Sequence, residues 1–294
     1  MGQDNGTAQP NKPAFWWDPR LYQIASLSIL LVYGLFWLQF DVSIWQIAIT
    51  LGVAQLTQFV GTRYFNLLFF DPKSALISSL SLCLLLRTND LAVAALAAII
   101  AIGSKFIIHW KDKHVFNPTN LALAVILGSG LGWISPGQWG QVVWFGFLIA
   151  CLGSLVVTRA ARADVTLAFL TFYVGLLFIR ALWLGDPLTI PQHQIESGAL
   201  LIFSFFMISD PKTTPDSRTG RIVYALLIAL TALYVQFGLF KPNGLLWGLI
   251  ACSPLVPFLD RLFPGVRYDW SKPTAGHAPV SIPLSLSLQP QRRF

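Results

Sequence analysis

Two stretches of the sequence gather polar side chains between long apolar runs, and the first extends from Lys105 to Asn120. Lys105 and His109 are four residues apart, a spacing that places two side chains on one face of a helix. Asn117 precedes Pro118 at the start of an apolar run, so we expect Asn117 to cap a new helix. A lysine, a histidine and an open helix N-terminus can bind an anion, such as a phosphate or the N1 position of a reduced flavin.

The second stretch, residues 205–215, ends a short apolar run with charged and hydroxyl side chains. Such groups can hold a ribityl chain or a phosphate through hydrogen bonds and charge. The candidate ligand-binding residues of the two stretches together are Lys105, His109, Asn117, Asn120, Asp210, Thr213 and Thr214.

Both stretches also have a plainer interpretation. Lys105 can extend its ammonium group along apolar surface to water, with His109 at the membrane interface. The second stretch can be an ordinary cytoplasmic turn, with capping residues and the arginines that are typical of that side.

Other kinds of chemistry find little support in the sequence. Cys83, Cys151 and Cys252 each lie inside an apolar run and form no CxxC pair, which argues against a zinc site or a cysteine-only iron–sulfur cluster. The sequence contains no phosphate loop, no HExxH motif and no Ser-His-Asp arrangement. The net charge of +7 indicates basic cytoplasmic loops rather than a nucleic-acid partner.

The composition predicts a helical membrane protein. The 294 residues are 55% hydrophobic and only 11% charged, whereas a soluble domain carries about 25% charged residues. Apolar runs of 17 or more residues recur along the chain, and they are continuous rather than alternating, which disfavours a β-barrel. We therefore expect an all-α polytopic membrane protein.

The polar stretches fall between ten predicted membrane segments. The third and eighth are too short to span a bilayer alone, and proline is expected to kink the last one at Pro254 and Pro257. The segments are 21–40, 44–60, 75–86, 91–109, 119–134, 141–158, 165–184, 197–209, 221–239 and 243–260. They divide the chain into a disordered tail (1–14), a first membrane repeat (15–135), a second membrane repeat (136–262) and a C-terminal tail (263–294).

The distribution of basic residues predicts the orientation. Counted on alternate sides of the ten segments, 17 Lys and Arg residues lie on the side of the termini and 3 on the other side. Basic loops stay in the cytoplasm, so we expect a multi-pass protein of the bacterial cytoplasmic membrane with both termini inside.

A weak internal repeat accompanies this pattern. Pro118 and Pro242 are 124 residues apart, Ala75 and Ala199 show the same offset, and Asp90 and Asp210 are 120 apart. Five segments per half is an odd number, so the second copy must be inverted in the membrane. Inverted repeats with short or broken helices place a central site at the interface between the repeats.

At the two polar stretches the chain resembles the RnfD/NqrB family, the membrane subunits of Rnf and of sodium-pumping NADH:quinone oxidoreductase. The similarity covers about residues 60–262 and is closest to the short, stand-alone RnfD-like branch that includes the UnbU proteins. The matching pieces are Gly103-Ser104-Lys105, 114–120, 205–211, Thr214-Pro215, Gly220-Arg221 and 255–260.

The resemblance implies ten helices in two inverted halves and a flavoprotein that passes electrons within or across the membrane. Family members carry covalent FMN on the threonine of a Ser/Thr-Gly-Ala-Thr motif after the fifth helix. The corresponding loop, residues 128–136, contains no threonine, so FMN or riboflavin would have to bind non-covalently between the halves. The resemblance also implies other membrane or periplasmic electron-transfer subunits as partners, besides membrane lipid.

The leading hypothesis is therefore an integral membrane subunit of an electron-transport complex, possibly coupled to ion movement. A second hypothesis is an inverted-repeat transporter or channel for a small solute or ion, although few polar residues lie within the predicted segments. A third is a non-catalytic scaffold for a membrane assembly.

Overall fold

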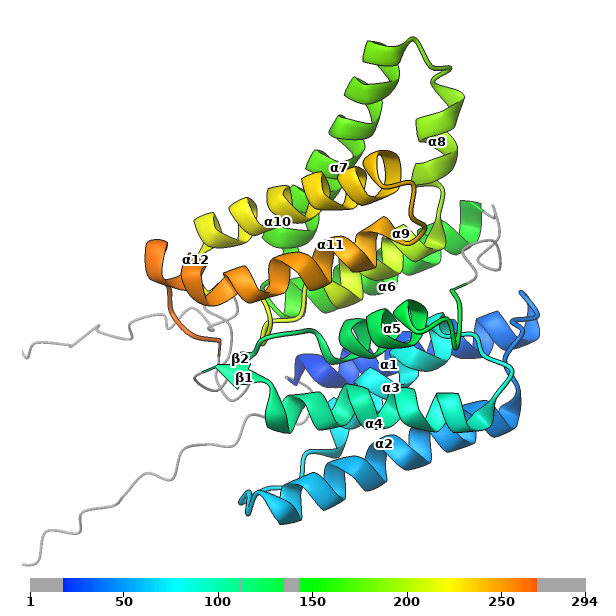
Figure 1. Cartoon of the computed structure of the whole chain (residues 1–294), viewed down its shortest axis with the longest axis vertical. Helices are drawn as coiled ribbons and strands as arrows, with labels where there is room; N and C mark the ends of the chain where they lie inside the picture. Colours follow the sequence, from blue (N-terminus) through cyan, green and yellow to red (C-terminus); the bar gives the residue numbers. More distant parts are fainter. Residues whose placement is uncertain (1–17, 111–112, 135–142, 269–294) are drawn as a thin grey trace, which may run out of the picture.

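The computed structural model describes residues 18–110, 113–134 and 143–268, with side chains of the last range from residue 146 onward. The predicted tails at 1–14 and beyond residue 268 lie outside the described residues. Figure 1 shows two groups of helices packed side by side, the first built from α1 to α5 and the second from α6 to α12.

The first group begins its helices at residues suited to that position. Asp18, Ser43, Asp90 and Asn117 each accept a backbone N–H with the side chain, which satisfies one of the free donors of a helix start. The elements are α1 (Pro19–Phe36), α2 (Ile44–Tyr64), α3 (Pro72–Leu85), α4 (Leu91–Ile107), β1 (His109–Trp110), β2 (Lys113–His114) and α5 (Pro118–Gly128).

The second group contains more interrupted helices. Two of its helices continue as π-helical turns, and a 3-10 turn at Pro254 interrupts the last one. A kink was predicted at Pro254 and at Pro257, and Pro257 lies in the first turn of α12. The elements are α6 (Val143–Arg159), α7 (Ala163–Leu184), α8 (Thr189–Ile195), α9 (Gly198–Ile202), η3 (Phe203–Met207), α10 (Arg218–Leu233), η4 (Tyr234–Gly238), α11 (Gly244–Cys252), η5 (Ser253–Leu255) and α12 (Val256–Leu262).

Five described helices are long and apolar enough to cross a membrane, so the chain is an integral membrane protein. They are Pro19–Phe36, Ile44–Tyr64, Ala163–Leu184, Arg218–Gly238 and Gly244–Leu262. The other predicted segments are apolar helices of 10–17 residues. The third and eighth are short, as expected.

Other predicted segments end earlier than expected, and the segment 21–40 ends at Phe36. The segment 91–109 ends at Ile107, because the chain then turns into the β1–β2 hairpin, in which His109 pairs with His114. The segment 119–134 ends at Gly128. The chain beyond the helix is extended at Trp133, which forms a backbone bridge with Arg87.

The helix α2 has polar residues inside and apolar residues outside. Gln46, Thr50, Gln58 and Thr62 are buried at intervals of four or eight residues, while the exposed large side chains include Leu56. This pattern is the opposite of that in a water-soluble protein, and it fits a helix whose outer surface is covered by lipid.

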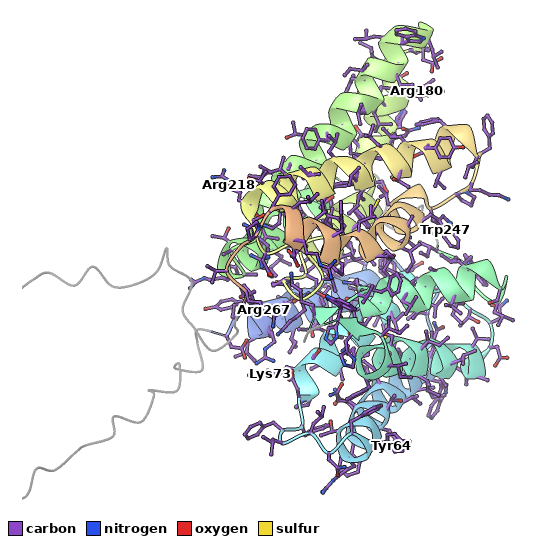
Figure 2. All side chains as sticks on the ribbon, turned by 60° about the vertical axis from the view of Figure 1, so that its left-hand side comes forward. Tyr64, Lys73, Arg180, Arg218, Trp247 and Arg267 are labelled. Atoms are coloured by element: carbon purple, nitrogen blue, oxygen red, sulfur yellow. The ribbon has the colours of Figure 1, made fainter. Side chains whose placement is uncertain are left out.

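The helices of each group pack in the same order. In the first group α1 contacts α3, α2 contacts α4, and α4 contacts α5. In the second group α6 contacts α9, α7 contacts α10, and α10 contacts α11. The groups meet where α1 packs on α6 and α5 packs on α11. Figure 2 shows the basic side chains Lys73, Arg218 and Arg267 toward one end of the bundle.

Candidate functional site

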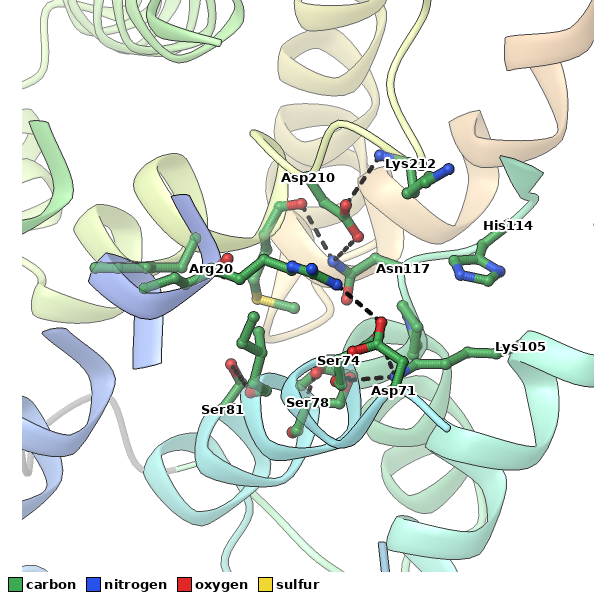
Figure 3. A pocket seen from close by; sticks show the side chains of 16 residues that line it. Arg20, Asp71, Ser74, Ser78, Ser81, Lys105, His114, Asn117, Asp210 and Lys212 are labelled. Carbon is green, nitrogen blue, oxygen red and sulfur yellow. Dashed lines mark hydrogen bonds and ion pairs between the residues drawn. The ribbon is translucent and has the colours of Figure 1, made fainter. Parts of the chain in front are cut away.

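A polar cavity of about 270 Å³ lies where the two groups of helices meet. The starts of α1, α3 and α5, the end of α4, the hairpin and the end of η3 all contribute to it (Figure 3). Its lining side chains are Arg20, Gln23, Asp71, Ser74, Ile77, Ser78, Ser81, Lys105, His114, Asn117, Pro118, Thr119, Phe206, Met207, Asp210 and Lys212. Charged residues from both groups therefore converge on one small space.

Lys105 occupies the wall formed by α3 and α4. Its Nζ atom donates to the backbone oxygen and to Oγ of Ser74, at 3.0 Å each, and the residue is only 9% exposed. Both acceptors are neutral, and no described carboxylate forms an ion pair with Lys105. A buried ammonium in such a setting favours an acceptor or an anion from a ligand.

Asn117 and Asn120 connect the two groups of helices. Asn117 caps α5, and its Nδ2 atom donates to the backbone oxygen of Met207 at 3.3 Å and to Oδ2 of Asp210 at 3.5 Å. Asn120 is fully buried and donates from Nδ2 to the backbone oxygen of Leu246 at 3.1 Å. Its Oδ1 atom has no hydrogen-bond partner in the described part of the chain. The predicted helix start therefore also fastens one half of the molecule to the other.

Asp210 lies in the turn that follows η3. Its Oδ1 atom accepts the backbone N–H of Lys212 at 3.0 Å, and burial raises the pKa of the carboxyl group above its usual value. Its backbone oxygen accepts the hydroxyls of Thr213 and Thr214, at 3.3 and 3.1 Å. The hydroxyl of Thr214 also accepts a hydrogen bond from Nε of Arg162 at 3.2 Å. The two threonines thus shape the turn.

The side chain of Asp71 is 41% exposed and marks the side of the cavity that is open to water. A chain of ion pairs lies at this mouth. Arg20 extends across it to Asp71, with Nη1 and Oδ2 2.9 Å apart (Figure 3). Arg20 also pairs with Asp18 at 3.0 Å, and Asp18 in turn accepts from Lys73 at 2.6 Å. Hydrogen bonds from these cations outweigh the effect of burial and lower the pKa of Asp18. The starts of α1 and α3 are therefore held together at the opening.

The β1–β2 hairpin closes another side of the cavity. His114 lines the cavity, and its Nδ1 atom has no hydrogen-bond partner in the described part of the chain. Burial, and then the nearby Lys105 and Lys212, lower the pKa of His114 to about 3, so the imidazole is neutral at pH 7. The adjacent Lys113 forms ion pairs with Asp216 at 2.8 Å and Asp260 at 2.7 Å. These pairs hold the hairpin against the second group of helices.

The structure places the seven predicted residues in three groups. Lys105, Asn117 and Asp210 line the cavity. Asn120, Thr213 and Thr214 are buried close behind it and make internal hydrogen bonds. The prediction that His109 shares a helix face with Lys105 is wrong, because α4 ends at Ile107 and His109 lies exposed on β1.

Sequence reasoning missed Arg20 and Asp71, although a signal for Asp71 was present. The triplet Asp-Pro-Lys occurs at Asp71 and again at Asp210, and both aspartates line the cavity. Asp71 precedes the short helix α3, whereas Asp210 follows the short segment ending in η3. One triplet precedes its short segment and the other follows its own. The two triplets therefore did not align when the two repeats were compared, and nothing in the sequence indicated that both aspartates line one cavity.

Long apolar helices around a polar internal cavity define a helical membrane protein with a polar site where its two groups of helices meet. Residues 91–268 match the sequence profile described as the NQR2, RnfD, RnfE family. This match covers more than half of the chain, and the chain belongs to that family. The matched region contains the hairpin, the Asn117 helix start and the Asp210 turn.

Curated relatives share part of their length with this chain. The chain is 33% identical over 135 residues to the RnfD subunit of the ion-translocating oxidoreductase complex of Erwinia tasmaniensis, which is 45% of this chain and 35% of the relative. The corresponding subunits of Citrobacter koseri and of an Escherichia coli strain are each 28% identical, over 133 and 137 residues. The aligned region thus spans about a third of each relative's length.

Proposed function

We propose that this protein is an RnfD-like subunit of a membrane electron-transfer complex and that its cavity holds a flavin, FMN or riboflavin, without a covalent bond. The observation that carries the proposal is the cavity itself, because it combines the two motifs of the family resemblance, Lys105 to Asn120 and the Asp210 turn, in one space. The curated relatives are subunits of an ion-translocating oxidoreductase complex. Coupling to ion movement and electron-transfer partner subunits are part of the same proposal.

The lining of the cavity fits the ring system of a flavin. The side chains of Ile77, Phe206 and Met207 supply apolar surface for a flat ring, and Lys105 and Asn117 supply donors for its oxygen and nitrogen atoms. The unpartnered Nδ1 atom of His114 is an additional polar atom for a ligand. The volume of about 270 Å³ is just below the usual range for ligand pockets, about 300–1,000 Å³. It suits the ring, with the side chain of the flavin toward the mouth.

The residues of this site have distinct roles in the proposal. A bound flavin would supply the one- and two-electron chemistry that side chains lack. Lys105, held by Ser74, would stabilise negative charge on the ring, and the start of α5 would add the positive end of its helix dipole. Asn117 would orient the ring, since Met207 fixes its amide. Arg20 and Asp71 would control the opening toward water.

We also propose that the ten apolar segments form two five-helix halves of inverted topology. The helix-capping positions support this, because Asp71 and Ser197, Asp90 and Ser217, and Asn117 and Asn243 are 126, 127 and 126 residues apart. The counterpart of Asp90 is then Ser217 rather than Asp210. The matching order of helix contacts in the two groups is a second support. Both termini would lie on the cytoplasmic side of the bacterial inner membrane.

Flavin binding is tested by purifying the protein in mild detergent and recording its visible spectrum. The protein is then denatured and filtered, and the filtrate is examined for released flavin. We expect flavin absorption in the purified protein and free flavin in the filtrate. A colourless protein with no extractable flavin contradicts the proposal, and uptake of a solute by proteoliposomes without a redox partner would favour the transporter hypothesis. A colourless protein that copurifies with partners would favour the scaffold hypothesis.

A pair of lysine variants locates the flavin. Lys105→Met should lose bound flavin, because it removes the buried ammonium from the cavity wall. Lys241→Met should retain it, because Lys241 is exposed and does not line the cavity. Circular dichroism shows whether both variants keep the helical fold. Equal flavin content in the two folded variants would place the flavin elsewhere.

A further inference from the structure

The segment that follows α2 exposes an unusual run of apolar side chains. All eight residues from 63 to 70 are exposed, and six of them are large and apolar or aromatic. Leu68 is 92% exposed and Phe69 is 84% exposed. Contiguous apolar surface of this kind is rare where a protein faces water, and it indicates a membrane or a partner. We refer to residues 65–70, which follow the last residue of α2, as the α2–α3 loop.

The α2–α3 loop has a defined shape. The ring of Phe65 stacks on Phe106 of α4, with centroids 5.6 Å apart, and Phe70 packs edge-on against Phe59 of α2, with centroids 6.1 Å apart. Asn66 adopts a positive φ of 51°, which turns the chain between these anchors. Because both ends are fastened, Leu67 to Phe69 form the tip, and their exposure is a property of the fold.

The loop continues the lipid-facing surface of α2. Leu56, Phe59 and Val60 are exposed on the last two turns of this helix, while Gln58 and Thr62 are buried. Only apolar surroundings stabilise a helix with this distribution, so lipid covers the face that includes Phe59. Phe70 packs on Phe59 itself, which joins the loop to that face without a break.

The length of α2 fixes the depth of the loop. Trp45 is 72% exposed near the start of the helix and Tyr64 is 79% exposed at its end. At about 1.5 Å per residue they are roughly 28 Å apart, close to the ~30 Å of a bilayer's hydrocarbon core. Tryptophan and tyrosine prefer its two boundaries. The loop therefore begins at headgroup level, where Arg63 holds its guanidinium over the Phe59 ring at 5.5 Å.

We propose that the α2–α3 loop is an interfacial anchor for the phospholipid bilayer. Its tip, Leu67 to Phe69, inserts into the boundary between headgroups and acyl chains, and Arg63 contacts the lipid phosphates. The next residue, Asp71, belongs to the mouth of the cavity and pairs with Arg20. The anchor thus sets the depth of the cavity mouth in the membrane. This inference does not depend on the identity of the ligand in the cavity.

The test uses a fluorescent label at position 68. Cys83 and Cys252 are buried, so Cys151→Ser supplies a background without an exposed thiol among the described residues. Leu68→Cys carries a polarity-sensitive label, and Val266→Cys is the control, because Val266 is 91% exposed but lies beyond α12. Both proteins are reconstituted alone into phosphatidylcholine–phosphatidylglycerol vesicles, with and without brominated acyl chains.

The anchor predicts different spectra for the two labels. The label at 68 should show a blue-shifted emission that is quenched by brominated acyl chains but not by iodide in water. The label at 266 should show no blue shift, and iodide rather than brominated chains should quench it. A label at 68 that iodide quenches as strongly as the label at 266 would overturn the proposal. Shielding of position 68 that arises only when partner subunits are added would also overturn it, in favour of a protein interface. Labelling at Phe69→Cys repeats the test if the first variant does not fold.

Discussion

At the residue scale, the two asparagines of the first polar stretch act as connectors between the halves of the molecule. Asn117 reaches Met207 and Asp210, and Asn120 reaches the backbone oxygen of Leu246. In a lipid-embedded protein a buried amide must find its partners within the protein. Here the partners belong to the other half, so each amide contributes both to the packing of the halves and to the shape of the cavity.

Substitution of Asn117 separates its two contributions. Asn117→Ser keeps a good helix cap but loses the amide donor, and we expect it to lower the free energy of unfolding by about 1 kcal/mol. Asn117→Asp also keeps the cap but places a second carboxylate beside Asp210, so it should cost more. Thermal unfolding in detergent measures both. Equal midpoints for the two variants would contradict the proximity of Asp210.

His114 predicts a pH dependence of stability. Burial lowers its pKa to about 3 in the folded protein from a usual value of 6.5. Between these values the unfolded chain binds a proton that the folded protein does not, so this residue makes stability fall as the pH decreases from about 6.5 toward 3. His114→Gln should flatten the profile of unfolding midpoint against pH. The exposed His109→Gln variant controls for loss of an imidazole. Parallel profiles for wild type and His114→Gln would contradict the burial of His114.

At the scale of elements, the second half depends on close contact between α10 and α11. Gly244 and Gly248 are one turn apart on α11, and a Cβ atom on either would meet the backbone of α10. Small residues at this spacing allow two helices in a membrane to approach closely. The start of α11, which carries Asn243, is therefore fixed against the end of α10.

A pair of glycine variants tests this contact. A Cβ atom at Gly248 would lie 3.0 Å from the backbone nitrogen of Ala232 and 3.0 Å from the backbone oxygen of Ile228, so Gly248→Ala should destabilise by about 1–3 kcal/mol. Gly175 lies within α7 with no atom that its Cβ would meet within 4 Å. Gly175→Ala should therefore be neutral or stabilise by up to ~1 kcal/mol. Unfolding midpoints that shift equally in both variants would argue against close helix packing.

At the scale of the whole molecule, one end of the bundle gathers most of the charged groups and the cavity mouth. The ion pairs of Arg20, Lys113 and Arg221 all lie at the end where α3, α5 and α10 begin. The other end carries fewer described ion pairs, among them Arg180 with Asp186. A partner that approaches from water would meet very different surfaces at the two ends.

The topology predicts opposite labelling of two exposed positions. Phe240, 83% exposed, lies in the turn between η4 and α11, whereas Val266, 91% exposed, follows α12 at the other end. In a Cys151→Ser background, an impermeant maleimide added to intact spheroplasts should modify Phe240→Cys and leave Val266→Cys unmodified. Permeabilised cells serve as the control, since both positions should then react. Modification of both positions from one side would contradict the proposed topology.

Patterns among neighbouring residues were enough to predict the class of the protein and most of its elements. Long apolar runs require lipid around them, and Asn117-Pro118 specified a helix start by local hydrogen bonding and fixed φ, so these features were predictable from neighbouring residues alone. The third and eighth segments were predictably short, because their apolar runs contain too few residues to span a bilayer. Lys105, Asn117 and Asp210 were chosen as candidates because their polarity is unusual beside apolar runs, and the structure places all three around one cavity.

The packing of the helices determines which of these residues share a cavity. Arg20 and Asp71 reach the mouth because α1 and α3 pack against each other, and His109 is excluded because the hairpin replaces the last turn of the predicted helix. The aspartates of the two Asp-Pro-Lys triplets line the same cavity, although one precedes a short segment and the other follows one. Most of these relations depend on contacts between elements that are distant in the sequence, such as Arg20 with Asp71, 51 positions apart, and Asn117 with Asp210, 93 positions apart. Local propensity carries no information about them, whereas the burial of polar groups between two helical halves fixes them.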